Sequence, residues 1–404
     1  MLSNRLAPAG EAPPDVAVAP ARPQVWHAVL AFVGVAAVLF VVMAHLSPRV
    51  PTPPMTPLNP PFVGPSWLRG WAQWDSGWYY RIASDGYSFA GRHQSTVAFF
   101  PVYPLLVRAV AVVVRNVWVA GIVVTFAAGA AAAGLLMAWL RDRMSPAAAW
   151  TALAVVFLYP YAFFLYGVVY PDAVFLVTVV AAFLLLESDH PVLAGLVGAL
   201  ATAARPVGVV LVVALAVRTV ERRGALRPAA GRFVDWSRLR RADAGVLLSV
   251  LGFLAWCLFL WHRFGDPLAF ATAEAGWQQS PGPNTWLKVR FFQDMAHIWN
   301  LRWWGVFYVS HSVLTIVAAC LIPRVFRRFG VGYGVYVSVL IGLSAVSTMN
   351  FFGMARYLLA AFPCFAVLGE MLAERPALRS TALTAGGLGL VAFTAIFGTG
   401  YYMS

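Results

Sequence analysis

Residues 192–217 read VLAGLVGALATAARPVGVVLVVALAV, an apolar stretch interrupted by Arg205 and Pro206. As one helix broken at the proline, it would carry residues 218–241 across a membrane. As a hairpin of two short helices, it would return them to the side from which the stretch started. Each arm of the hairpin would be roughly 20 Å long at most, shorter than the ~30 Å core of a bilayer. Such short arms are possible only when they are buried among other helices.

The loop that follows decides between these two paths. Residues 218–241 carry eight arginines, and their only acids are Glu221 and Asp235. Short loops rich in arginine stay on the cytoplasmic side of a membrane. This rule favours the hairpin, with a tight outer turn at 205–206.

The composition of the whole chain agrees with a membrane location. Hydrophobic residues make up 61% of the 404 residues and charged residues 11%, and the mean hydropathy is +0.74. An ordinary globular domain is about 45–50% apolar and about 25% charged. These values exclude a soluble enzyme, a disordered protein and a fibrous one. The net charge of +13 comes from arginines in short loops, so it does not indicate a nucleic-acid partner.

We therefore predict an all-α, polytopic membrane protein with about eleven spans, its N-terminus inside and its C-terminus outside. Residues 1–24 are predicted to be a disordered cytoplasmic tail, and 25–404 a single transmembrane domain with large outer loops at 47–116 and 264–302. The run 99–114 is interpreted as an interfacial helix, because this choice keeps the basic loops 141–146, 218–241, 323–328 and 374–379 together inside. Besides 192–217, the long apolar runs are 25–46, 117–140, 147–166, 171–187, 244–262, 303–322, 331–349, 357–373 and 380–400.

Few carboxylates reach the outer side under this topology. They are Asp75, Asp85, Asp172, Asp266, Glu274 and Asp294. Next to Gly86, Asp85 is typical of a turn, and so is Asp266 before Pro267. At the start of an apolar run, Asp172 is typical of a helix N-cap. The surroundings of Glu274 give no second reason to choose it.

Asp75 lies in WLRGWAQWDSGWYYRIASDGY (67–87), the most aromatic part of the first outer loop. If this stretch is one helix, Trp71, Asp75, Trp78, Tyr79 and Ile82 share a face. Two interpretations stay open. Asp75 is either the N-cap of an interfacial helix anchored by tryptophans, or a functional carboxylate in an aromatic surface.

Two arginines in apolar surroundings need a partner. A charge at mid-bilayer costs about 2.5–3.5 kcal/mol, so Arg205 must pair with a carboxylate, bind an anion or extend to the lipid headgroups. Arg356, in NFFGMARYLLAAFP, allows the same alternatives. His311 is interpreted as a satisfied core histidine. No HExxH, CxxC, Walker or GxGxxG motif occurs, so neither a metal nor a cofactor is predicted.

Together these features indicate a site at the outer face of the membrane. An acid, two arginines and aromatic surfaces suit a lipid-linked sugar, whose phosphate would lie at headgroup level and need a cation. Transfer with inversion would need one carboxylate to take the proton of the acceptor hydroxyl.

Several motifs resemble a known family. WDSGWYYRIASDGY (74–87) followed by FFPVYPLLVR (99–108) resembles the signature of PIG-V type mannosyltransferases, which are membrane enzymes of the GT-C glycosyltransferase class. Weaker matches follow in the same order: PYAFFLYGVVYPDAVFLV (160–177), ATAARPVG (201–208), FGDPLAF (264–270) with Trp277, and ARYLLAAFP (355–363). The resemblance covers about residues 67–365.

The resemblance implies a GT-C fold, a polyprenyl-phosphate-mannose donor and Asp75 as the catalytic base. We take Arg205, Arg356, Trp78, Tyr79, Tyr103 and Asp172 as substrate-binding candidates. The chain departs from the family at Asp172, where members usually carry a glutamate. Its arginine- and proline-rich composition is typical of a bacterial protein, and such a cell makes no GPI anchor. The expected acceptor is therefore another lipid, a glycan or a protein, and the expected location is the cell membrane.

Two alternatives remain beside the transferase. A transporter or lipid flippase would explain the hydropathy and Arg205, but not the carboxylate in the aromatic first loop. Transporters more often place ionisable groups at mid-membrane on broken helices. A catalytically inactive scaffold of the same fold is the third hypothesis, against which the presence of both Asp75 and Arg205 counts.

Overall fold

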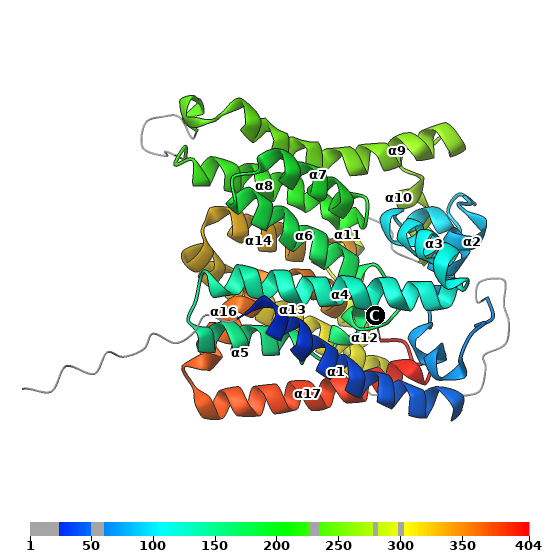
Figure 1. Cartoon of the computed structure of the whole chain (residues 1–404). Helices are drawn as coiled ribbons and strands as arrows, with labels where there is room; N and C mark the ends of the chain where they lie inside the picture. Colours follow the sequence, from blue (N-terminus) through cyan, green and yellow to red (C-terminus); the bar gives the residue numbers. More distant parts are fainter. Residues whose placement is uncertain (1–23, 50–59, 227–233, 278–281, 298–302, 404) are drawn as a thin grey trace, which may run out of the picture.

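The computed structural model describes residues 24–49, 60–226, 234–277, 282–297 and 303–403, and this part of the chain is helical (Figure 1). Its only β-type pairing is an isolated antiparallel bridge between Leu226 and Val234. The α-helices are α1 (Val25–Leu46), α2 (Ser76–Asp85), α3 (Val102–Val114), α4 (Val117–Arg141), α5 (Pro146–Phe157), α6 (Asp172–Glu187), α7 (Pro191–Thr202), α8 (Val210–Arg222), α9 (Leu251–Phe264), α10 (Ala269–Glu274), α11 (Pro283–Trp286), α12 (Val289–Ala296), α13 (Trp303–Phe329), α14 (Val331–Ser347), α15 (Met354–Tyr357), α16 (Phe362–Ala373) and α17 (Pro376–Gly398). The 3₁₀ segments used below are η2 (Ser66–Trp71), η3 (Thr96–Ala98), η5 (Pro206–Val209), η8 (Arg241–Val250) and η11 (Leu358–Ala360).

Within the described ranges, five helical segments are long and apolar enough to cross a membrane. They are Val25–Arg49, Val117–Arg141, Arg241–Phe264, Phe307–Phe329 and Pro376–Gly398. A sixth span is possible if Met354–Ala360 and Phe362–Ala373, which meet at a bend of 83°, are taken together. The prediction of an all-α membrane protein is thereby confirmed. The other predicted spans are shorter helices, so the number eleven stays a prediction.

Helix α4 runs through the middle of the bundle and contacts α1, α3 and α6 (Figure 1). Its close packing depends on small residues. A Cβ added to Gly129 would lie 2.1 Å from the Leu165 carbonyl oxygen, so only glycine lets this backbone approach so closely. The segment that is held in this way leads directly to Tyr170 and Asp172, which belong to the site described below.

The stretch 192–217 forms two short helices, α7 and α8, as predicted for a hairpin. Arg205, at the break, pairs with Asp172 at the start of α6. Arg218, on α8, pairs with Glu187 at the other end of α6. Helix α8 therefore runs back along α6 to the level from which α7 started. The short arms are covered, because α7 packs against η8 and α8 against α14.

The predicted basic loops gather at one end of the bundle. Arg143 pairs with Glu187, which also pairs with Arg218. Arg223 pairs with Asp189, and the Arg328 guanidinium donates to the Arg143 carbonyl oxygen. Their position at a single end agrees with the predicted topology.

The structure contradicts three predictions made from the sequence. Residues 67–87 are not one helix, because η2 ends at Trp71 and α2 begins only at Ser76. The run 147–166 ends its helix at Phe157, ahead of Pro160. Residues 323–328 are not a loop, because α13 continues through Pro323 to Phe329. A proline near a helix end removes one hydrogen bond, and here the following turns continue in spite of it. The predicted tail falls outside the described residues except for Gln24.

The two ends of the bundle can be assigned to sides of the membrane by labelling. We expect a cysteine at the exposed Ser237 to be protected from an impermeant reagent in intact cells, and one at the exposed Ser66 to react. The expectation follows from the arginines of 218–241. The measurement uses single-cysteine variants in a background that lacks the three natural cysteines, with permeabilised cells as the control. Labelling of position 237 in intact cells would exclude the topology.

Candidate functional site

Four charged side chains meet at the end of the bundle opposite the basic loops. Asp75 precedes α2, Asp172 begins α6, Arg205 lies in the break between α7 and α8, and Arg356 lies on α15. The side chain of Asp75 is 24% exposed, whereas that of Asp172 is 2% exposed and those of the two arginines are 10% exposed. Asp75 is therefore the most accessible of the four side chains. All four are site candidates predicted from the sequence, and the structure brings them together.

Arg205 and Asp172 form the most tightly paired part of this cluster. One guanidinium nitrogen of Arg205 donates to Asp172 Oδ1. The Arg205 guanidinium also lies over the Tyr357 ring, 4.5 Å from its centroid. Asp172 makes no N-terminal capping bond, because it is the first residue of α6 and the N-cap position belongs to Pro171. The proline side chain has no atom that can accept a hydrogen bond. The interpretation of Asp172 as a helix cap was therefore wrong, and its role is to pair with Arg205.

Arg356 lies between the two carboxylates and is held more loosely. Its Nη1 is 3.7 Å from Asp75 Oδ2, and its Nε is 3.9 Å from Asp172 Oδ1. Both distances exceed that of a normal hydrogen bond, so these contacts are electrostatic. Aromatic faces surround the guanidinium, with the Tyr170 centroid at 4.9 Å and the Tyr357 centroid at 5.2 Å. Arg356 therefore keeps N–H groups that could bind an anion.

A strained backbone positions Asp75. Trp74 has a φ of +57°, a left-handed conformation that a bulky residue rarely adopts. The N–H of Asp75 donates to the Tyr170 hydroxyl over 3.0 Å. Asp75 occupies the N-cap position of α2, but its side chain makes no capping bond. Of the two interpretations left open, the structure contradicts a capping role for the carboxylate.

The surroundings also change the acidity of two carboxyl groups. Burial raises the pKa of Asp75 above its usual 3.8, and the positive charge of Arg356 offsets this only in part. Glu274, on α10, was set aside in the sequence analysis. Burial, together with the negative charge of Asp75, raises the pKa of Glu274 to about 7. Glu274 is thus an electrostatic neighbour of Asp75, which only the folded structure could reveal.

The aromatic candidates are placed around this cluster rather than in it. The Trp78 ring stacks on Phe99 and meets the edge of Trp277. The Tyr79 ring contacts Tyr103 and Tyr170.

Tyr103 is completely buried. Its hydroxyl bonds to the Gly121 carbonyl oxygen at 3.0 Å and to Thr125 Oγ1 at 2.8 Å. The structure therefore gives Tyr103 a packing role and does not bring its hydroxyl to the site. Trp78 and Tyr79 support the position of Asp75 through α2.

Unpaired polar atoms concentrate at this site. Buried polar groups are usually hydrogen-bonded, and exceptions need an explanation. Among the described residues, seven buried side-chain nitrogen or oxygen atoms lack a hydrogen-bond partner. Five of them belong to the cluster or its neighbours: Trp71 Nε1, Ser76 Oγ, Asp172 Oδ2, His311 Nε2 and Arg356 Nε. A polar ligand with several hydroxyl groups or anionic oxygens could supply the missing partners. His311 was interpreted as satisfied, and this was wrong.

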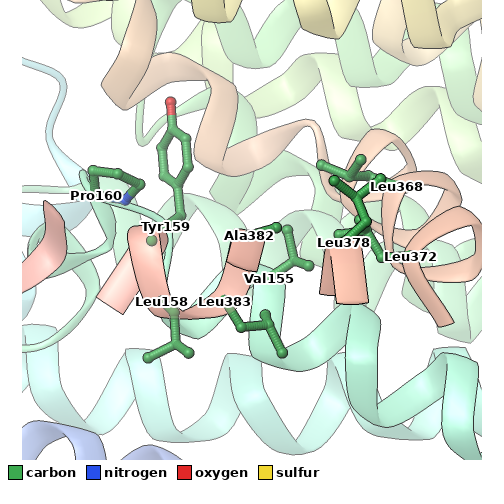
Figure 2. A pocket seen from close by; sticks show the side chains of 10 residues that line it. Val155, Leu158, Tyr159, Pro160, Leu368, Leu372, Leu378, Ala382 and Leu383 are labelled. Carbon is green, nitrogen blue, oxygen red and sulfur yellow. The ribbon is translucent and has the colours of Figure 1, made fainter. Parts of the chain in front are cut away.

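A separate apolar cavity is lined by none of these charged side chains. It has a volume of about 340 Å³ and is bounded by α5, α16 and α17 (Figure 2). Leucine, valine, alanine and proline line it almost entirely. Its one polar side chain, Tyr159, donates through its hydroxyl to the carbonyl oxygen of Ala355, the residue before Arg356. Within the described residues, no group of three His, Cys, Asp or Glu side chains could hold a metal ion.

No protein-family model, curated protein or solved structure matches this chain. The resemblance to PIG-V type mannosyltransferases therefore stays a prediction that rests on the quoted motifs.

Removing one member of the buried ion pair should destabilise the fold. We expect Arg205→Ala to lower the free energy of unfolding by about 3–5 kcal/mol, because it leaves the Asp172 carboxylate buried without its cation. The double variant Asp172→Asn with Arg205→Gln should recover part of this loss, since neither charge then remains unpaired. Thermal unfolding of the purified protein measures both.

The matched control is Arg240→Ala, which breaks a pair with Asp189 in which both side chains are largely exposed. Exposed pairs contribute about 0–1 kcal/mol. Equal stability of Arg205→Ala and Arg240→Ala would show that the pair at the site does not hold the fold together.

Proposed function

We propose that this protein is a membrane glycosyltransferase of the GT-C fold, with about eleven spans and its site on the extracytoplasmic face. It transfers mannose from a polyprenyl-phosphate-mannose donor to a hydroxyl of a lipid, glycan or protein, with inversion and without a metal. The observation that carries the proposal is a partly exposed carboxylate, Asp75, held 3.7 Å from a loosely bound arginine, Arg356.

Asp75 has the properties of a general base. It is the most accessible member of the cluster, and no capping bond occupies its carboxylate. Its raised pKa makes it a stronger proton acceptor than an ordinary aspartate. In the proposed reaction the acceptor oxygen bonds to the anomeric carbon of mannose and its proton moves to Asp75. The bond from that carbon to the phosphate oxygen breaks, and polyprenyl phosphate leaves with the electron pair.

Arg356 is better placed than Arg205 to bind the donor phosphate. Arg205 is closely paired with Asp172, whereas both ion-pair contacts of Arg356 among the described residues are longer than a hydrogen bond. An arginine can offer several N–H groups to a phosphate and can stabilise the charge that develops on it. The direct anion-binding role therefore falls to Arg356, while Arg205 holds Asp172.

The apolar cavity supports a donor with a long lipid chain. Figure 2 shows leucines from α16 and α17 facing Val155 and Leu158 across it. Tyr159 connects this surface to the backbone next to Arg356. A prenyl chain in the cavity and a phosphate at Arg356 would therefore contact neighbouring parts of the same chain.

The second candidate is a transporter or flippase. The feature that favours it is the break between α7 and α8, where Arg205 is buried between two short helices. The two functions differ in their need for Asp75 as a base, because transport forms no covalent bond.

Replacing Asp75 tests the transferase directly. We expect Asp75→Asn to lose about 10²–10⁴-fold in the rate of mannose transfer, because the amide keeps the shape but accepts no proton. Asp75→Glu should recover little, since moving the carboxylate by about 1 Å can cost about 10²-fold. The assay is transfer of labelled mannose from polyprenyl-phosphate-mannose to a membrane lipid extract.

Donor binding by the same variant should be retained. Asp85→Asn is the matched control, because Asp85 is exposed at the end of the same helix. Transfer by Asp75→Asn within a few-fold of the wild-type rate would remove Asp75 as the base.

The dependence of transfer on pH should report the same carboxylate. As the pH falls through the raised pKa of Asp75, the base becomes protonated and kcat/KM should fall tenfold per pH unit. Arg356→Gln should move this acidic limb to higher pH, because the positive charge of Arg356 lowers the pKa of Asp75. The control is Arg263→Gln, an exposed arginine at the end of α9. A limb that moves to lower pH in Arg356→Gln would contradict the assignment.

A further inference from the structure

His311, on α13, is buried and uses only one of its two ring nitrogens. Nδ1 lies 3.1 Å from the carbonyl oxygen of Phe351, while Nε2 is buried without a partner. A carbonyl oxygen can only accept, so the proton on Nδ1 is inferred from this contact. His311 has no ion pair among the described residues, and a buried cation without one is costly. The ring is therefore neutral, and Nε2 carries a buried lone pair of electrons to which no described group donates.

The carbonyl partner belongs to the turn that positions Arg356. Phe351 has a φ of +60°, and Gly353, two residues later, has a φ of +76°. A Cβ added to Gly353 would lie 2.9 Å from the Tyr357 ring, so a side chain there would be crowded as well as strained. A left-handed φ at a bulky residue such as Phe351 is strained, and strained residues of this kind cluster at functional sites. His311 thus contacts the turn that leads to Arg356.

A continuous row of aromatic rings connects His311 with Asp75. The His311 ring lies 4.0 Å from Phe307, and Phe307 lies 5.9 Å from Tyr402. Tyr402 meets Trp74 edge to face at 5.0 Å, and Trp74 directly precedes Asp75. Trp74 is 45% exposed. The row therefore begins at the accessible side of the site and ends at the unpaired nitrogen.

We propose that His311 Nε2 accepts a hydrogen bond from a hydroxyl group of the substrate, whose ring lies against this aromatic row. Aromatic faces bind the apolar face of a pyranose, and a bare acceptor selects one of its hydroxyl groups. The proposal rests on the proposed function, and the hydroxyl could come from the donor sugar or from a sugar of the acceptor. Residues 401–403 follow α17 without regular secondary structure. Tyr402 also stacks on Phe352 at 4.8 Å, so a sugar ring that reaches Nε2 must displace one of these aromatic rings.

Two substitutions separate ligand binding from a structural role. The amide nitrogen of His311→Asn lies near the position of Nδ1 and can still donate to Phe351, but nothing replaces Nε2. The amide of His311→Gln reaches the position of Nε2 and can accept there, but the bond to Phe351 is lost. We expect His311→Asn to weaken the binding of one substrate about 10-fold and His311→Gln to weaken it less, because the hydrogen bond to the substrate hydroxyl is lost only in His311→Asn.

The probes are polyprenyl-phosphate-mannose and a membrane lipid extract. A higher Kd for polyprenyl-phosphate-mannose in His311→Asn supports the proposal and assigns the hydroxyl to the donor. An unchanged Kd with a higher KM for the extract supports it and assigns the hydroxyl to the acceptor. Wild-type behaviour of His311→Asn with an impaired His311→Gln would overturn it, and would leave His311 as a support for the turn.

A spectroscopic readout keeps this test independent of transfer. In ¹⁵N-histidine protein, the resonances that His311→Asn removes should show a protonated Nδ1 and a bare Nε2. Methyl α-mannopyranoside should shift the Nε2 resonance. A protonated Nε2, or no shift with saturating methyl α-mannopyranoside and none with the membrane lipid extract, would overturn the proposal. A wild-type protein that shows the shift but never transfers mannose would contradict the proposed transferase activity and leave the proposed role of His311 in sugar binding intact.

Discussion

Two arginines and two aspartates share a volume from which most water has been removed, and the architecture around them keeps the group neutral. An isolated charge in such surroundings would be costly, so every member needs an opposite charge within reach. Arg205 meets this need through Asp172, and Arg356 lies between Asp172 and Asp75. The four side chains come from four segments that are far apart in the sequence. The bundle must therefore fold completely before the cluster exists.

Interruptions of helices supply these side chains. Arg205 lies where α7 gives way to η5 and α8, and Arg356 lies where α15 and η11 bend by 83° into α16. Asp75 lies between η2 and α2, next to the left-handed Trp74. Backbone at such breaks has unpaired polar groups, so within a membrane it must be buried in protein. The short helices α7 and α8 meet this condition through η8 and α14. The Tyr357 ring lies beside both guanidinium groups of the cluster.

The sequence allowed the broad architecture to be predicted, because that depends on local composition. Arginine-rich segments and Pro206 were enough to predict the hairpin of α7 and α8. The break at residues 72–75 was not predictable, because helical spacing of Trp71, Asp75 and Trp78 assumes a continuous helix. Tertiary contacts, including the hydrogen bond from the Asp75 N–H to the Tyr170 hydroxyl, hold the backbone of residues 72–75 outside a helix.

The pairing within the site was also beyond sequence reasoning. Asp172 looked like a helix cap, and its partnership with Arg205 depends on how α6 packs beside α7. Glu274 and His311 had ordinary local surroundings. Their proximity to Asp75 and to Phe351 depends on contacts between segments distant in the sequence. What the sequence did indicate were the residue types that are costly to bury, and these residues form the cluster.

The loose contacts of Arg356 connect donor binding to the basicity of Asp75. The charge of Arg356 lowers the pKa of Asp75, while burial raises it. Under the proposed function, a phosphate that attracts Arg356 weakens its hold on Asp75 and adds a negative charge nearby. Both effects raise the pKa of Asp75, so the carboxylate becomes the stronger base when the donor is bound. Linkage makes the effect reciprocal, because a proton on Asp75 then strengthens the binding of phosphate. The same arginine can therefore hold the leaving group and keep the base weak until there is a sugar to transfer.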